Sequence, residues 1–258
     1  MSAAQAATVA PLATQEMSPT ERQARLDLAI LYRAFVHYGW TDFLYTHISA
    51  RVPDQPDCYL INPYGLLFHE VNAGNLIKVT LAGEVIAGDY PFNDAGHGIH
   101  SAVLGARPDA MFVAHSHTRA GIAVSAMRQG LMPLSQQANE IRREIAYHAY
   151  DVVTEAAEEC ERLTADLGAK NLMIMHNHGL LTLGRTAGEC FYNLYTLENA
   201  CKVQVDVLAC DPDPILPSEE AQARAALWGV PGPEAQTQKE WAALSRLIEK
   251  VAPDYKEF

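Results

Sequence analysis

The sequence has few basic residues and no long apolar stretch. Lys and Arg number 19 against 31 Asp and Glu, which gives a formal net charge of −12 at pH 7. Phosphate-rich partners bind clustered Lys and Arg, so this balance argues against a nucleic acid or an anionic membrane as partner. No apolar run approaches the roughly 18 residues that a membrane-spanning helix requires. We therefore expect neither a nucleic-acid-binding protein nor a membrane-spanning one.

Cysteine is also scarce. The five cysteines are an odd number and form no CxxC pair. A disulfide framework would need even, dense spacing, so reduced thiols in a cytoplasmic protein fit better. The first 17 residues, rich in Ala, Thr and Gln, lack a basic start followed by an apolar stretch. We interpret residues 1–17 as a disordered tail and not as a signal peptide, and we expect the protein to be cytoplasmic.

What is present is a regular alternation of helix and strand signals. Ser18 and Glu21 form a predicted capping box, apolar residues recur at helical spacing up to Phe35, and Gly39 ends the pattern. Similar reasoning predicts a strand pair with a loop at 53–57, a hairpin around Ala82-Gly83, helices at 96–106, 154–167, 186–210 and from 237, and buried strands at 110–114 and 171–175. This pattern indicates one α/β or α+β domain over residues 18–210 and a C-terminal extension over 211–258, whose helix would pack on the domain or on a neighbouring subunit.

Three histidines are the strongest chemical signal. His115 and His117 are two residues apart at the end of a predicted strand, so both rings could face one ion. His178 ends the next buried strand, and strands that are consecutive in the chain often lie side by side. Three neutral imidazoles would leave coordination positions open, as a catalytic metal ion requires. Spacing alone leaves open the alternative of ordinary surface or core histidines.

The stretch from about Thr46 to Ala209 resembles the class II aldolase/adducin family. The matching segments are Thr46-His47-Ile48-Ser49-Ala50-Arg51, residues 60–71, Ile99-His100-Ser101-Ala102, Ala106-Arg107-Pro108-Asp109, His115-Ser116-His117-Thr118 and His176-Asn177-His178-Gly179-Leu180. The resemblance implies a three-layer α/β/α domain with a mostly antiparallel central sheet. It also implies one divalent ion, zinc foremost with manganese or cobalt as alternatives, on His115, His117 and His178; His176 falls one step off the ligand positions.

The acid/base position departs from the family pattern. Aldolases of the family carry a Glu shortly before the two paired histidines, and that position is Gly96 here. The neighbouring Asp94 and His97 are candidate replacements, and His97 is favoured because a free imidazole titrates near pH 6.5. The alternative for His97 is a solvent-facing residue at a helix start. Tyr255 is a third candidate, since tails near active sites in this family can supply a Tyr, with a frayed terminus as the alternative.

The residues that bind a substrate phosphate in the aldolases are also changed. Their Asn and Ser pair correspond to His47, Asp94 and Ala95 here. A carboxylate would repel phosphate and two donors are missing, so a sugar phosphate is disfavoured. The candidate residues for binding a small non-phosphorylated substrate are His47, Asn62, Tyr64 and Gly65.

Within the family, the sequence looks most similar to the adducin-like branch. Animal adducins use this domain as an assembly module of the membrane skeleton, but this chain has no long basic tail after it. We predict a metal-dependent carbon–carbon lyase, either an aldolase or a decarboxylase, that acts through a metal-stabilised enolate. The alternatives are a metal-dependent sugar epimerase and a non-catalytic assembly domain. The resemblance further implies a homo-oligomer, with a tetramer favoured.

Overall fold

The computed structural model describes residues 17–151, 157–227 and 237–258. The predicted tail therefore lies outside the described residues except for its last member, as does the predicted start of the helix at 154–167. The described residues form one eight-stranded sheet with the strand order β4-β3-β2-β1-β5-β8-β7-β6. Neighbouring strands are antiparallel except β6 and β7, which are parallel. The strands are β1 His47–Val52, β2 Gln55–Ile61, β3 Ile77–Thr80, β4 Val85–Ala87, β5 Phe112–Ser116, β6 Ile145–His148, β7 Leu172–Met175 and β8 Gly179–Gly184.

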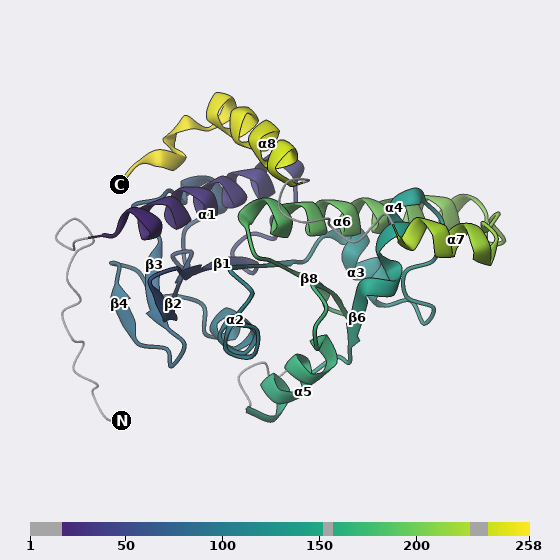
Figure 1. The fold of residues 1–258 in the computed structure, drawn as a ribbon, viewed down its shortest axis with the longest axis horizontal. Coiled ribbons are helices and arrows are strands. Elements are labelled where there is room, and N and C mark those ends of the chain that lie inside the picture. Colours follow the sequence, from purple (N-terminus) through teal and green to yellow (C-terminus); the bar gives the residue numbers. More distant parts are fainter. Residues whose placement is uncertain (1–16, 152–156, 228–236) are drawn as a thin grey trace.

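Helices cover both faces of this sheet (Figure 1). On one face, α1 packs on β1, while α3 and α6 pack on β8. On the other face, α2 packs on β1 and β5, and α5 packs on β6. The predicted α/β architecture with three layers and a mostly antiparallel sheet is thus confirmed. The helices are α1 Pro19–Tyr38, α2 Asp94–Ala106, α3 Arg119–Ser125, α4 Gln136–Ile141, α5 Ala157–Leu167, α6 Ala187–Cys210, α7 Glu219–Ala226 and α8 Thr237–Val251, with short 3-10 turns η2 Phe68–Glu70, η3 Arg142–Glu144 and η4 Pro253–Lys256.

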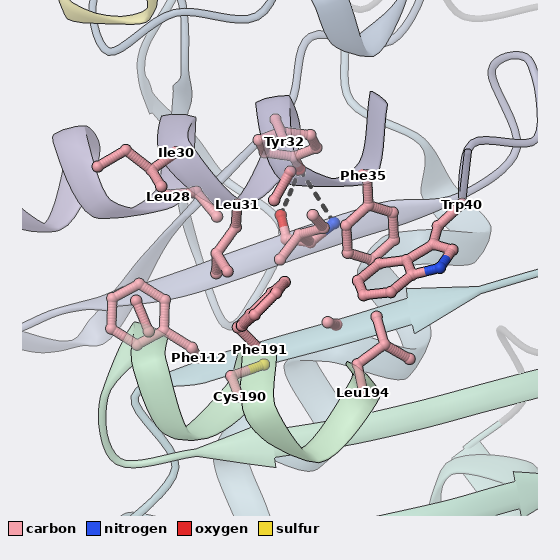
Figure 2. Close-up of a cluster of buried hydrophobic side chains, with 14 of the residues drawn as sticks. Leu28, Ile30, Leu31, Tyr32, Phe35, Trp40, Phe112, Cys190, Phe191 and Leu194 are labelled. Carbon is pink, nitrogen blue, oxygen red and sulfur yellow. Dashed lines mark hydrogen bonds between the residues drawn. The ribbon is translucent and has the colours of Figure 1, made fainter. Parts of the chain in front are cut away.

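Helix α1 shows how local sequence signals set these elements. The Ser18 side chain accepts the backbone N–H of Glu21, and Gly39 ends the helix with φ 68°. The apolar face of α1 packs with α6 against the sheet in a core that includes Leu28, Phe35 and Phe191 (Figure 2). The Glu21 carboxylate, expected to return a capping bond to Ser18, instead pairs with buried cations of the fold.

The phenol of Tyr32 fixes α1 to the first two strands. Its hydroxyl donates to the Ile48 carbonyl and, at 2.9 Å, toward Asn62 Oδ1, and it accepts the backbone N–H of Ile48 at 3.0 Å (dashed lines at Tyr32 in Figure 2). Tyr32 is fully buried, so these partners offset the cost of taking its hydroxyl out of water. The start of β1, where His47 lies, is thereby held in place.

Strand β8 was missed by the sequence analysis. It inserts between β5 and β7, so the strand that pairs with β5 is β8 and not β7. The predicted loop at 53–57 is also shorter than expected, because β2 already begins at Gln55. Such pairings depend on which strands meet in space and leave little trace in local sequence.

The C-terminal segment covers α1 and α6 from outside. Helix α8 packs against both helices through buried Leu244 and Ile248. Beyond it, Asp254 forms an ion pair with Arg33 at 2.8 Å, and the Tyr255 carbonyl accepts the N–H of Ala73. Within the described ranges, no helix combines the length and the apolar character that crossing a membrane needs.

Candidate metal centre

Two antiparallel strands bring the first histidines to one edge of the sheet layer. In the register between β1 and β5, His47 lies opposite His115, and His117 follows directly after β5 ends at Ser116. His115 is buried, and its Nδ1 lies 2.9 Å from the carbonyl of Leu180 on β8. A carbonyl only accepts hydrogen bonds, so the Nδ1 of His115 carries the proton. Its Nε2 therefore presents a lone pair.

His178 lies in the turn between β7 and β8, and not at the end of a strand as the sequence suggested. Asn177 takes a left-handed conformation with φ 55°, which lets the chain reverse tightly here. A Cβ at Gly179 would lie 2.3 Å from the Ser116 carbonyl oxygen, so only glycine allows β8 to begin this close to the end of β5. The turn places His178 beside the other two rings.

The three predicted ligands converge. One ring nitrogen from each of His115, His117 and His178 lies within 4.8 Å of the other two. The ring centroids of the three pairs are 4.6, 4.8 and 4.9 Å apart. This spacing suits three imidazoles that share one ion.

An aspartate that sequence reasoning missed orients the second ring. Asp42 Oδ2 lies 2.9 Å from Nδ1 of His117, so this nitrogen also carries a proton in the neutral ring. The Nε2 atoms of His115 and His117 lie 2.8 Å apart. With both protons on Nδ1, two lone pairs face each other, an arrangement that a cation between them would relieve. Carboxylate or carbonyl partners on the far nitrogen are typical of metal-binding histidines.

The protonation states fit a metal ligand set. Burial, together with the neighbouring imidazoles, lowers the pKa of His115 well below its ordinary value. Burial first, and then His117 and His148, lower the pKa of His178 to about 4. Both rings are therefore neutral at pH 7, and only neutral imidazole binds a metal ion.

The centre opens into a cavity of about 550 Å³. Its lining contains no Lys or Arg among the described residues but two carboxylates, Asp42 and Asp151. Aromatic rings stand at its mouth, where Tyr45, Tyr64 and Tyr150 are 38–57% exposed. The cavity is thus large enough for a small molecule.

Two of the four predicted substrate-binding residues line this cavity, His47 and Tyr64. Asn62 is buried and bonded to Tyr32, which makes it a structural residue of the β1–β2 pair. Gly65 lies in a turn with φ 109° and does not line the cavity.

None of the three predicted acid/base residues lines the cavity within this chain. The ring of His97 stacks on Tyr59 and bonds its hydroxyl through Nδ1 at 2.6 Å, because position 97 faces the β2 side of helix α2. Asp94 is exposed at the start of α2. Tyr255 is buried in η4, where its hydroxyl donates to Glu249 at 3.3 Å. The expectation that His97, Asp94 or Tyr255 moves the proton is therefore not supported by their positions.

The comparisons with known proteins agree with this fold. The profile described as "Class II Aldolase and Adducin N-terminal domain" matches residues 26–205. The chain therefore belongs to the class II aldolase and adducin family.

The proteins to which it is similar include an aldolase and an adducin. The crystal structure of an aldolase II superfamily protein from Pseudomonas syringae is 41% identical, with a TM-score of 0.86, over 93% of this chain and 97% of that one. L-fuculose 1-phosphate aldolase from Glaciozyma antarctica is 26% identical, with a TM-score of 0.81, over 95% and 98%. Alpha-adducin of Rattus norvegicus is 36% identical over 90% of this chain but only 34% of its own length.

Proposed function

We propose that this protein is a metal-dependent carbon–carbon lyase that cleaves a small, non-phosphorylated carbonyl or hydroxy-acid substrate. The observation that supports this most is the pair of Nε2 lone pairs of His115 and His117 that face each other across 2.8 Å, with His178 beside them. His115, His117 and His178 would hold one divalent ion, with zinc favoured because all three ligands are imidazoles. Bound there, the ion supplies Lewis-acid stabilisation of negative charge on a substrate oxygen.

The chain's own residues define the substrate class. No Lys or Arg among the described residues lines the cavity, and its two carboxylates, Asp42 beside His117 and Asp151 paired with Arg162, supply no donor for a phosphate. Tyr64 and Tyr150 can contact an apolar or hydroxylated part of the substrate. These features favour a carbonyl substrate that carries no phosphate group. Its aldol cleavage or its decarboxylation would each pass through an enolate.

Metal content tests the proposal most directly. The purified protein should carry about one zinc, manganese or cobalt ion per chain by elemental analysis, as one three-histidine site predicts. His178→Ala should lose the ion. His176→Ala is the matched control, since His176 lies two residues away but turns its Nδ1 to the Ser125 carbonyl. A correctly folded wild-type chain that binds none of these ions would contradict the proposal.

Product analysis separates the enzyme classes. The metal-loaded protein is mixed with phosphate-free hydroxy-acids, and with aldehydes plus pyruvate, and the products are identified by mass spectrometry. A lyase releases two fragments or CO₂, whereas an epimerase returns one isomer of unchanged mass. An isomer as sole product would overturn the lyase assignment.

The likeness to alpha-adducin favours one further candidate, a non-catalytic assembly domain. A scaffold has no need for three convergent imidazoles with free lone pairs, and the centre here is intact. Normal folding and assembly with no bound metal would favour the scaffold.

We also propose that the protein is a cytoplasmic homotetramer. The exposed aromatic residues Phe43, Tyr45 and Tyr150 near the cavity suit burial against a second subunit. None of the five cysteines, all of which lie in the described residues, forms a disulfide, which fits a reducing compartment. Analytical ultracentrifugation should give four times the 28.3 kDa chain mass. A monomer at micromolar concentration would contradict this assembly.

A further inference from the structure

Gly96 and His47 occupy one space between helix α2 and strand β1. A Cβ added at Gly96 would lie 2.7 Å from Cδ2 and 3.0 Å from Cγ of His47. Real Cβ atoms do not approach other atoms this closely, so any side chain at position 96 is excluded by the His47 ring. Position 96 is where the family resemblance places the acid/base Glu. In this chain, the imidazole of His47 fills the place from which that carboxyl group would act.

The ring of His47 lies directly beside the metal centre. It stacks on His115 with the centroids 5.0 Å apart and 29° between the planes, and it lines the cavity. Its Nδ1 is bonded to His100, while its Nε2 has no hydrogen-bond partner within the described part of the chain. One ring nitrogen of His47 is therefore available to a molecule in the cavity.

A buried chain of hydrogen bonds decides whether that nitrogen carries a proton. His47 Nδ1 lies 2.7 Å from His100 Nε2, and His100 Nδ1 is bonded to the hydroxyl of Ser49. If Ser49 donates to His100, then His100 donates to His47, and His47 carries its proton on Nε2. The reverse order would leave the Ser49 hydroxyl proton without an acceptor in the described residues. A buried hydroxyl without an acceptor is costly, so the first order is favoured.

The imidazole rings of His47 and His100 are both neutral. Burial lowers the pKa of His100 to about 3, so this ring is neutral, and the Nδ1 of His47, which accepts the proton of His100, belongs to a neutral ring as well. A neutral imidazole with a fixed N–H is a hydrogen-bond donor that can polarise a carbonyl group without first changing its charge.

We propose that His47 is a catalytic residue that donates a hydrogen bond from Nε2–H to the substrate oxygen on which negative charge develops, in place of the family's carboxyl group at position 96. His100 and Ser49 are positioning residues that fix the proton on Nε2. The inference rests on the proposed lyase function, but its structural part is testable without any substrate.

The first test reads the position of the proton. The protein is labelled with ¹⁵N-histidine, and the ring resonances of His47 are assigned by their loss in His47→Gln. The expected spectrum has a protonated Nε2 and an unprotonated Nδ1 at His47. Ser49→Ala should remove this preference. A wild-type spectrum with the proton on Nδ1 would overturn the inference, whether or not the protein proves to be a lyase.

The second test measures the competition for space. Gly96→Ala should lower the urea midpoint of unfolding in the wild-type background, although alanine is the better helix former. In the His47→Ala background, the same change should leave the midpoint unchanged or raise it, because the space is then empty. Equal destabilisation in both backgrounds would overturn the packing argument.

The third test uses the substrate found in the product screen. His47→Ala should lower kcat about 10²–10³-fold, as expected for loss of one donor to a developing oxyanion, with the metal content unchanged. His47→Gln, which keeps an N–H at similar reach, should recover part of this loss. Ser49→Ala should have a smaller effect that disappears in the His47→Ala background. Full kcat in His47→Ala, or equal losses in His47→Ala and His47→Gln, would overturn the catalytic role, while absence of bound metal would instead contradict the proposed function.

Discussion

Two buried polar clusters lie on opposite sides of strand β1, and they are built on opposite principles. Under helix α1, Glu21 pairs with Lys78 at 2.7 Å and with Arg25 at 3.1 Å, and Arg25 also donates to the carbonyls of Ala73 and Leu76. Opposite charges meet there, and the protein itself supplies the partners. Such a cluster joins α1 to the sheet and has no opening for a ligand.

The histidine cluster brings like groups together. One ring nitrogen from each of His115, His117 and His178 lies close to the other two, and all three residues face a cavity. Nothing in the described chain satisfies the facing lone pairs. Burial alone therefore does not mark a functional site. A cluster of polar groups that lack bonding partners within the protein does, because a ligand can supply them.

The largest effect should come from breaking the ion-pair cluster. Glu21→Gln leaves Arg25 and Lys78 buried without a countercharge, and it should lower the free energy of unfolding by about 3–5 kcal/mol. Urea unfolding measures this, and metal content should stay unchanged in whatever fraction folds. Glu220→Gln, which breaks only the exposed pair with Arg224, is the control and should cost less than about 0.5 kcal/mol. Similar losses in both variants would remove the distinction between the clusters.

Added metal should stabilise the folded protein through the histidine cluster alone. Zinc at about 100 times its dissociation constant should raise the free energy of unfolding by about 2.7 kcal/mol, because it binds the folded chain. A chelator should reverse the gain, and His115→Ala should abolish it. A gain that survives in His115→Ala would place the ion elsewhere.

Asp42 gives a finer test of how the centre is oriented. Asp42→Asn weakens the partner of His117 Nδ1 and should reduce metal affinity about 10- to 100-fold, measured by competition with a coloured chelator. Asp57→Asn makes the same charge change at an exposed position near the start of strand β2 and serves as control. Equal affinities in the two variants would show that Asp42 does not support the ligand.

The smallest predicted effect is a dependence of stability on pH. The pKa of His100 is about 3 in the folded chain, against about 6.5 for a free imidazole. Below pH 6.5, the unfolded chain therefore binds a proton that the folded chain does not, and stability falls as the pH falls. Between pH 7.5 and 5.5, His100 alone should cost about 1.4 kcal/mol in the metal-free protein. Urea unfolding of His100→Gln should show a pH-dependent loss smaller by this amount; an unchanged loss would show that other groups cause it.

Structural features that depend only on residues close together in the chain were predictable from the sequence. The Ser18 side chain caps its helix as expected, without the return bond from Glu21, and the hairpin around Ala82-Gly83 forms as well. In each case, the residues that determine the structure lie within one turn of it. The family resemblance added the layered fold, which no local pattern could establish.

Parts of the site that depend on distant packing were not predictable. His97 is on the right helix but faces Tyr59, and one position along the helix rotates a side chain by about 100°. Asp42 lies 75 residues from His117 in a loop without any motif. The sequence does not explain why position 96 is glycine. The reason is steric and appears only in the structure, where the His47 ring occupies the space that a side chain at position 96 would need.

The ion pair between Arg33 and Asp254 joins residues 221 positions apart, so it closes a loop of nearly the whole chain. During synthesis, the outer face of α1 therefore stays uncovered until α8 and Asp254 have left the ribosome. Contacts between such distant segments slow folding, since the chain loses entropy before they form. Helix α1 is thus made long before the segment that encloses it.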